Sequence, residues 1–300
     1  MDIIFHIGAH RTATTSFQAC ARANAALLAR AGLAVWEPRM LRRGLLDGLG
    51  TDRALRARGR VQFRLARAAR DGTRQVVVSE ENMLGSVRAN IRARSLYPDA
   101  GARMARYAAV VDNAVRCVVL TVRALDLYWA SALAYGVGRG HSVPGPDARD
   151  ALAAAPRTWR DVITDVAKAL PQAELIVVPF ERIAGRPRQL LRAATGQHLP
   201  LSGADIWCNR APDVADLTEH LAARGSAHVL QTEGGRWQPF SPLQAGLLRE
   251  AYVDDMAWLS AGADGLATLW EETRPETNGD TPAWAFRRGQ GYDQRTRRLA

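Results

Sequence analysis

The segment from His6 to Ser16 holds the residues of this chain that are best suited to binding an anion. The apolar run Ile3–Ile7 predicts a buried strand before it, and the apolar period over Ser16–Arg30 predicts a helix after it. A strand-to-helix turn directs successive backbone N–H groups and the positive end of the helix dipole toward one point. Arg11 adds a fixed positive charge, and four side chains add hydroxyl donors: Thr12, Thr14, Thr15 and Ser16. The segment therefore predicts an anion-binding loop, with an ordinary turn capped by Thr12 or Thr14 as the alternative.

This loop does not follow the Walker A pattern. That motif, G-x-x-x-x-G-K-[ST], places a lysine sixth after its first glycine. With Gly8 as the first glycine, Thr14 stands at that position, and no acidic strand end of the Walker B type follows. Hydrolysis of ATP or GTP is therefore disfavoured, and a P-loop small-molecule kinase is the weakest functional alternative.

The loop resembles a motif of a known family. His6-Ile7-Gly8 followed by Arg-Thr-Ala-Thr-Thr at residues 11–15 is similar to the 5′-phosphosulfate loop of sulfotransferases, usually written H-I-G-x-x-K-T-G-T-T. Arg11 replaces the lysine of that pattern, and Ala13 replaces its second glycine. The resemblance implies that this loop holds the sulfo-donor end of a nucleotide.

A second segment is similar to the same family. The predicted strand 116–122 ends at Arg123, and Ser131 follows eight residues later on the predicted helix Ala124–Tyr135. Sulfotransferases carry an arginine and a serine at these places, where the pair binds the 3′-phosphate of the nucleotide. A guanidinium and a hydroxyl can share the oxygens of one phosphate. The alternative is a surface arginine and a solvent-facing serine.

A third segment resembles the C-terminal cofactor loop and helix of glycan sulfotransferases. It comprises residues 234–239, Gly-Gly-Arg-Trp-Gln-Pro, followed by Tyr252, Asp255 and Leu259. The resemblance places Gly235 and Arg236 beside the nucleotide, and it leaves Trp237 either stacked on adenine or packed in the core. Residues 175–183, with Pro-Phe-Glu at 179–181, are similar to the last core strand and its turn. These segments occur in the order of the family and span residues 3–259.

The resemblance, to bacterial and glycan sulfotransferases, implies a reaction. A sulfo group would pass from 3′-phosphoadenosine 5′-phosphosulfate (PAPS) to a hydroxyl or amine of an acceptor, without a metal. Arginine stabilises charge on the leaving phosphate but does not give up a proton, so His10 is the candidate acid. The implied cofactor contacts are Gly8, Arg11, Thr12, Ala13, Thr14, Thr15, Ser16, Arg123, Ser131, Gly235, Arg236 and Trp237. A non-catalytic nucleotide- or polyanion-binding protein of the same fold is the alternative.

The acceptor needs a base, and Glu80 is the first candidate. It follows the predicted strand Gln75–Val78, at the carboxyl edge of the sheet where open α/β folds place their sites. The alternative is a helix cap, with Ser79 as N-cap and Glu80 and Glu81 in the first turn. His141, in the Gly- and Pro-rich loop 136–146, is the second candidate for the base.

Five short apolar runs predict the strands that position these residues: Ile3–Ile7, Leu33–Trp36, Gln75–Val78, Arg116–Val122 and Glu174–Val178. Continuous apolar runs are typical of parallel strands covered on both faces. Helices are predicted between them, including 53–71 and 156–170. We therefore expect an α/β fold, P-loop-like, with three α/β/α layers, a central parallel sheet of about five strands and a helical C-terminal part.

The domain organisation follows from the same pattern. Residues 1–274 are expected to form one domain, with no clear strand after about residue 205 and a helix over Ser241–Leu259. Residues 275–300, rich in Gly, Pro and Arg, are expected to be partly disordered or draped on the surface.

Much of the positive charge lies in one stretch. Residues 39–74 hold eleven arginines and three aspartates. The stretch could form a basic wall for an acidic acceptor such as a uronate-containing or sulfated glycan, but two amphipathic helices with solvated arginines are favoured. No recognition-helix or zinc pattern and no aromatic interleaving is present in it, which disfavours nucleic acid.

Composition excludes several further classes. The chain has 300 residues, 47% of them hydrophobic, a formal charge of +10 and no apolar run near the roughly 20 residues of a membrane span. Its start lacks the pattern of a secretory signal. Cys20, Cys117 and Cys208 are far apart, which argues against a disulfide framework or a thiolate metal site and favours the cytoplasm. The oligomeric state is left open.

Overall fold

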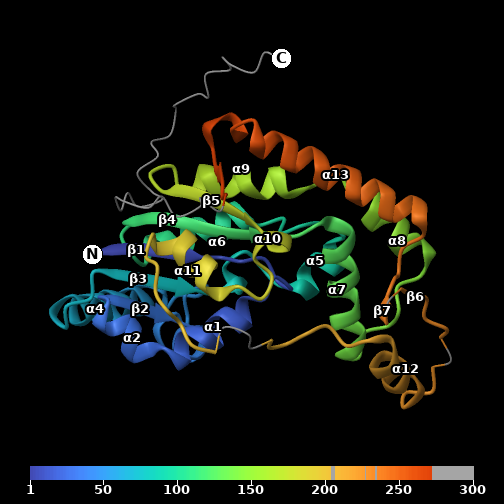
Figure 1. The fold of residues 1–300 in the computed structure, drawn as a ribbon, viewed down its shortest axis with the longest axis horizontal. Helices are drawn as coiled ribbons and strands as arrows, with labels where there is room; N and C mark the ends of the chain where they lie inside the picture. Colours follow the sequence, from blue (N-terminus) through green and yellow to red (C-terminus); the bar gives the residue numbers. More distant parts are fainter. Residues whose placement is uncertain (204–206, 227, 234, 272–300) are drawn as a thin grey trace, which may run out of the picture.

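The computed structural model describes residues 1–203, 207–226, 228–233 and 235–271. Its centre is a six-stranded parallel sheet with the strand order β2-β3-β1-β4-β5-β8 (Figure 1). The strands are β1 (Asp2–His6), β2 (Leu33–Trp36), β3 (Gln75–Ser79), β4 (Val115–Val122), β5 (Glu174–Pro179) and β8 (Thr268–Leu269). The prediction of an α/β fold with a parallel sheet is confirmed.

Helices cover both faces of this sheet because successive strand residues are apolar and point to opposite sides. Ile4, Val77 and Val119 belong to one buried cluster, and Phe5 and Val118 belong to the other. The first cluster is completed by α1 (Thr14–Ala23), α2 (Ala25–Arg30) and α11 (Pro187–Thr195). The second is completed by α4 (Ala54–Arg70), α5 (Val87–Ala93), α6 (Ala100–Ala109), α7 (Leu125–Gly138), α9 (Trp159–Ala169) and α13 (Pro242–Ser260).

The remaining elements are short and connect these layers. They are α3 (Pro38–Met40), the π-helical η1 (Leu41–Leu45), η2 (Glu81–Met83), α8 (Pro146–Ala153), α10 (Phe180–Ile183), α12 (Val214–Ala222), η3 (Ala263–Gly265) and an antiparallel pair, β6 (Thr232–Glu233) with β7 (Arg236–Trp237). None of the helices in the described ranges is both long and apolar enough to cross a membrane.

All five predicted strands are present, within one residue of their predicted ends. The expectation of no strand beyond residue 205 is wrong, since β8 adds a sixth strand to the sheet and β6 pairs with β7. Each of these has two residues, too few for an apolar run to mark it. The helix predicted over Ser16–Arg30 is two helices, broken at Asn24, whose amide nitrogen donates to the carbonyls of Cys20 (2.8 Å) and Ser202 (2.9 Å).

The C-terminal helix α13 supports the sheet edge that carries Arg123. As expected, Ser241 caps this helix, accepting from Gln244 N at 3.3 Å. Its buried Asp255 caps α9, accepting from Trp159 N at 2.9 Å. Trp159 Nε1 in turn donates to the carbonyl of Arg123 at 2.7 Å. The predicted tail, 275–300, and the domain boundary at residue 274 lie outside the described residues.

Candidate anion-binding and active site

The predicted loop lies where the sheet's connections change direction. From β1 the chain adds β2 and β3 on one side, then crosses back to place β4 and β5 on the other side of β1 (Figure 1). The helices that follow β1 and β4 therefore lie on opposite faces. In open α/β sheets, ligands bind at the carboxyl ends of the strands at such a switch point. The β1–α1 loop with Arg11 follows β1, and Arg123 follows β4.

The backbone of the β1–α1 loop forms a ring of donors. Arg11 and Ala13 both have left-handed conformations, with φ of 68° and 61°. Alternating left- and right-handed residues turn successive N–H groups toward one side, as in anion-binding nests. Helix α1 has no side-chain cap, and the amides of residues 11–15 have no acceptor within the described part of the chain. These amides and the helix dipole are free for an anion.

Buried side-chain donors lie under this ring without partners. His6 Nε2 and Thr14 Oγ1 make no hydrogen bond within the described structure, although both side chains are buried. A Cβ on Gly8 would lie 2.8 Å from Thr14 Oγ1 and 3.0 Å from His6 Nε2, so both atoms converge on the space beside this glycine. Burial lowers the pKa of His6 to about 4, so its ring is neutral at pH 7. The loop thus encloses polar atoms that require a ligand.

Three arginines meet at the same edge. Arg11 Nε donates to Ser131 Oγ at 3.1 Å, and Arg123 Nη1 donates to the Arg11 carbonyl at 2.9 Å. Burial lowers the pKa of Arg123 to about 10, with further lowering by Arg11 and by Arg236. Arg123 lies over the Phe180 ring at 4.9 Å, and its buried Nε has no hydrogen-bond partner in the described structure.

No carboxylate in the described residues pairs with Arg11 or Arg123. The nearest acidic groups are engaged elsewhere. Glu181 accepts from Ala124 N (2.9 Å) and from the Tyr252 hydroxyl (3.0 Å), and Asp126 pairs with Arg249 at 2.8 Å. Glu181 and Asp126 partly offset the charge of Arg123 but form no ion pair with it. Two partly buried guanidiniums without a carboxylate ion pair make this edge a candidate anion site.

The structure brings most of the predicted cofactor residues together, in a changed arrangement. Ser131 contacts Arg11 and not Arg123. The Thr12 hydroxyl turns back to the Ala9 carbonyl, and Ser16 Oγ accepts from Cys208 N at 2.9 Å. The hydroxyls of Thr12 and Ser16 are therefore engaged in hydrogen bonds within the fold. The Thr14 hydroxyl has no partner in the described structure, and Thr15 is half-buried.

Of the predicted cofactor residues at 235–237, one is buried in the core and two lie at the surface. Trp237 is 5% exposed and belongs to the apolar cluster, which is the packing role considered for it. Arg236 is exposed and contributes positive charge near Arg123, and Gly235 forms the turn between β6 and β7 with φ of 77°.

Glu80 lies at the predicted sheet edge, but its carboxylate is fully engaged. Arg42 forms a bidentate pair with it, at 2.8 Å from Nε and 2.6 Å from Nη2. The same carboxylate accepts from Asn82 N at 2.9 Å, which caps η2. Arg42 also reaches Glu81 at 3.0 Å. Glu80 is 2% exposed, so it can act as a base only after Arg42 moves away.

His10 lies between this pair and the cationic edge. Its backbone N–H donates to the Tyr97 hydroxyl at 2.9 Å, and its Nδ1 is 2.9 Å from the same oxygen. The Asn82 amide satisfies both neighbours when its nitrogen donates to His10 Nε2 (3.0 Å) and its oxygen accepts from Arg42 Nη2 (3.0 Å). Nδ1 then carries the proton. Burial lowers the pKa of His10, so the imidazole is neutral at pH 7 and is not poised as an acid.

The other candidate base, His141, takes part in none of these contacts within the described residues. His141 is exposed beyond the end of α7, and its backbone N–H donates to the Gly136 carbonyl at 3.0 Å. Within the described chain its side chain makes no hydrogen bond to the site.

Sequence reasoning missed three residues of the site: His6, Arg42 and Tyr97. His6 stands in the motif but gave no sign that its ring would lie under the loop. Arg42 was one of many arginines in the basic stretch, and no local pattern pairs it with Glu80, 38 positions away. Tyr97 has a left-handed backbone with φ of 41°, which no residue pattern indicated.

Comparisons with known proteins give no further information about this site. Family models, curated proteins and solved structures were compared with this chain, and none of them matches it. In the described ranges, no three His, Cys, Asp or Glu side chains are grouped so that they could hold a metal ion.

Proposed function

We propose that this protein is a sulfotransferase that binds PAPS at the carboxyl ends of β1 and β4 and transfers its sulfo group to an acceptor hydroxyl or amine. One observation carries the proposal. Arg11 and Arg123, both without a carboxylate partner in the described residues, lie beside the free amides of residues 11–15. Such a site is suited to a multiply charged anion. Its donors come from two strand ends, so the anion can carry charge at two places.

The donor nucleotide offers charge at two ends, which suits this arrangement. The loop amides, Arg11, His6 and Thr14 would hold the 5′-phosphosulfate. Arg123 would hold the 3′-phosphate, together with the Ser131 hydroxyl once Arg11 turns to the sulfo-bearing end. Arg236 supplies a third positive charge near Arg123.

The reaction then has defined requirements. The bond between sulfur and the bridging phosphate oxygen breaks, a bond forms from sulfur to the acceptor oxygen or nitrogen, and the acceptor proton passes to a base. Negative charge grows on the leaving phosphate, and the loop amides and Arg11 would stabilise it in a preorganised way. Arg11 cannot protonate that oxygen, so the bisphosphate would leave as an anion bound to the loop. Glu80 would take the acceptor proton after losing Arg42.

Calorimetry with adenosine 3′,5′-bisphosphate tests the binding site. Arg11→Ala and Arg123→Ala should each weaken binding at least tenfold, or about 1.4 kcal/mol. Arg123→Ala should also abolish the preference for the bisphosphate over adenosine 5′-monophosphate, because that residue is assigned to the 3′-phosphate. Arg70→Ala, an exposed arginine at the end of α4, is the control. Unchanged affinity in both site variants would overturn the proposal.

A matched glycine pair tests the space beneath the loop. Gly8→Ala would place a methyl group 2.8 Å from Thr14 Oγ1 and close the space beside His6, so bisphosphate binding should fall tenfold or more. Gly50→Ala meets nothing within 4 Å and should bind as the parent does. Equal affinities for the two variants would show that the ligand does not enter this loop.

A non-catalytic nucleotide-binding protein is the second candidate, and the Glu80–Arg42 pair favours it. Arg42 engages both oxygens of the buried Glu80 carboxylate, so neither oxygen is free to contact an acceptor. Consumption of PAPS in the presence of sugar, phenol and amine acceptors separates the two. If turnover is found, Glu80→Gln should bind the bisphosphate normally and lose that turnover. Bisphosphate binding without turnover on any acceptor class identifies the binding protein.

A further inference from the structure

Helix α4 carries the basic stretch that the proposed function does not use. Over Ala54–Arg70 it contains six arginines and no acidic residue. Its inner face is apolar, with Ala57, Val61 and Leu65 buried against the sheet. The outer face is also apolar at its centre, since the side chains of Leu55 and Phe63 are 78% and 72% exposed. The solvent face of a surface helix is normally dominated by charged and polar groups.

The outer face is a strip bordered by cations. At about 100° per residue, Leu55, Gly59, Phe63 and Ala66 fall along one side of the helix. All four are exposed, and a Cβ on Gly59 would meet nothing within 4 Å, so no other part of the described structure covers the strip. We call these four residues the outer strip.

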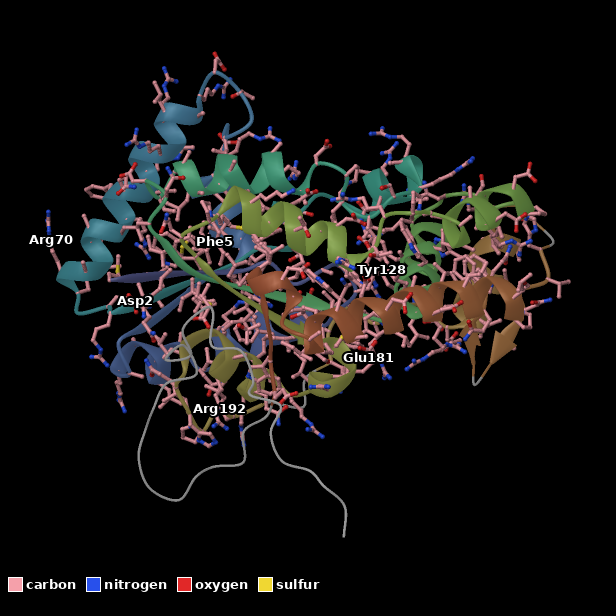
Figure 2. All side chains as sticks on the ribbon, turned by 90° about the horizontal axis from the view of Figure 1, so that it is seen from above. Asp2, Phe5, Arg70, Tyr128, Glu181 and Arg192 are labelled. Atoms are coloured by element: carbon pink, nitrogen blue, oxygen red, sulfur yellow. The ribbon has the colours of Figure 1, made fainter. Side chains whose placement is uncertain are left out.

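Arginines lie along both edges of the outer strip: Arg56 and Arg67 on one edge and Arg58 on the other, with Arg70 at the end of the helix. Figure 2 shows Arg70 at the outer edge of the molecule, directed away from the sheet. Arg58 pairs with Asp112 at 2.5 Å, and Arg67 lies 3.9 Å from Asp71. Arg56 and Arg70 make no ion pair within the described residues, so charge is available to a partner.

We propose that the outer strip of α4 and its bordering arginines dock on an anionic lipid surface. A helix that lies in the membrane interface buries large apolar side chains among the lipids and places arginines at the phosphate level. Leu55 and Phe63 supply the apolar side chains, and Arg56, Arg67 and Arg70 supply the cations. The helix would lie on the membrane and not cross it.

The apolar residues favour a lipid surface over a soluble polyanion. An acidic glycan or a nucleic acid would bind the arginines through its charges. It would leave the apolar side chain of Leu55 exposed to water, which is unfavourable. A lipid surface uses both parts of the pattern. This proposal does not depend on the nucleotide site, which lies at the sheet edge, and it stands if the sulfotransferase proposal fails.

Vesicle co-sedimentation of the full chain tests the proposal. The protein should bind vesicles of equimolar phosphatidylcholine and phosphatidylglycerol, and bind phosphatidylcholine alone weakly. Leu55→Ser with Phe63→Ser should reduce binding to the anionic vesicles about tenfold or more, because both side chains lose their burial. Arg56→Ala and Arg67→Ala should each reduce it by about fivefold, and added salt should weaken binding.

The control carries the same chemical change on another helix. Leu243→Ser with Val253→Ser removes exposed apolar side chains from α13, 76% and 59% exposed, and should leave vesicle binding unchanged. All these sites are on the surface, and equal melting temperatures would show that the variants fold. Failure of the parent to bind anionic vesicles overturns the proposal. So does loss of binding only in the arginine variants together with equally tight binding to heparin, which would assign the face to a soluble polyanion.

Discussion

Two charged clusters share the carboxyl edge of the sheet, and they are built in opposite ways. After β1 and β4, Arg11 and Arg123 lie together with no carboxylate partner in the described residues. After β3, Glu80 and Glu81 are both paired with Arg42, so that two carboxylates share one guanidinium. The first cluster is positive and open to a ligand, whereas the second is closed on itself.

The difference indicates what each cluster requires. Partly buried cations that lack an ion pair, beside free amides, are expected to destabilise the unliganded protein and to favour the binding of an anion. A buried carboxylate paired through two guanidinium contacts has both oxygens engaged within the fold. In the proposed site, Arg11 would have to release Ser131 when the nucleotide binds, and the acid–base half would need Arg42 to move away from Glu80.

The largest effect on stability is expected at the closed cluster. Arg42→Met leaves Glu80, 2% exposed, as an unpaired buried carboxylate. We expect a loss of about 2 kcal/mol in the free energy of unfolding, below the full cost of breaking a buried pair because Arg42 itself is 46% exposed.

Urea unfolding at pH 8 measures this effect. Arg39→Met, an exposed arginine without an ion pair in the described chain, is the control and should change stability little. An Arg42 variant as stable as the parent at pH 8 would mean that Glu80 is not held by this pair, and the two clusters would no longer differ.

The open cluster should respond in the opposite direction, by a smaller amount. Arg123→Met removes a partly buried cation whose pKa burial lowers to about 10. We expect the free energy of unfolding to rise by about 1 kcal/mol, while bisphosphate binding is lost. Arg249→Met is the contrasting variant, because it deprives the buried Asp126 of its partner at 2.8 Å and should destabilise.

Thermal and urea unfolding of both variants test whether Arg123 destabilises the unliganded fold. If Arg123→Met destabilises as much as Arg249→Met, the fold already compensates the Arg123 charge, and no ligand is required to do so.

The smallest effect is expected in the loop backbone. Ala13 has a left-handed conformation with φ of 61°, at the position where the sulfotransferase pattern has glycine. Ala13→Gly should raise the free energy of unfolding by up to about 1 kcal/mol, because glycine adopts this conformation without a steric penalty. Ala19→Gly, inside α1, should lower it by about 1 kcal/mol. Differential scanning calorimetry measures both, and a destabilised Ala13→Gly would show that the loop is not strained there.

Much of the fold could be predicted from local pattern. Runs such as Val76-Val77-Val78 are apolar on both faces, and only a parallel sheet between two helical layers buries them fully. The strands β6, β7 and β8 could not be predicted, because two residues carry no periodicity and their pairing depends on what lies beside them. The break at Asn24 depends likewise on its contact with Ser202, 178 residues away.

The candidate site was predicted in part. The position of Arg11 in a strand-to-helix loop and of Arg123 at a strand end followed from sequence, since parallel strands bring their carboxyl ends to one edge. The choice of partners did not follow, because hydrogen bonds between side chains depend on distances of a few tenths of an ångström. Ser131 was expected beside Arg123 and contacts Arg11. Glu80 was expected as the base, or within a capped helical turn, and it pairs with Arg42.

The sequence by itself determined the alternation of strands and helices, the donor-rich loop after β1, and the excess of arginine in residues 39–74. These are local properties of residue type and spacing. Only the tertiary structure decided which charges are compensated and which are left open, and which face of α4 meets the solvent. The reason is physical: compensation and exposure depend on what a residue meets across the fold, and neighbours along the chain do not encode it.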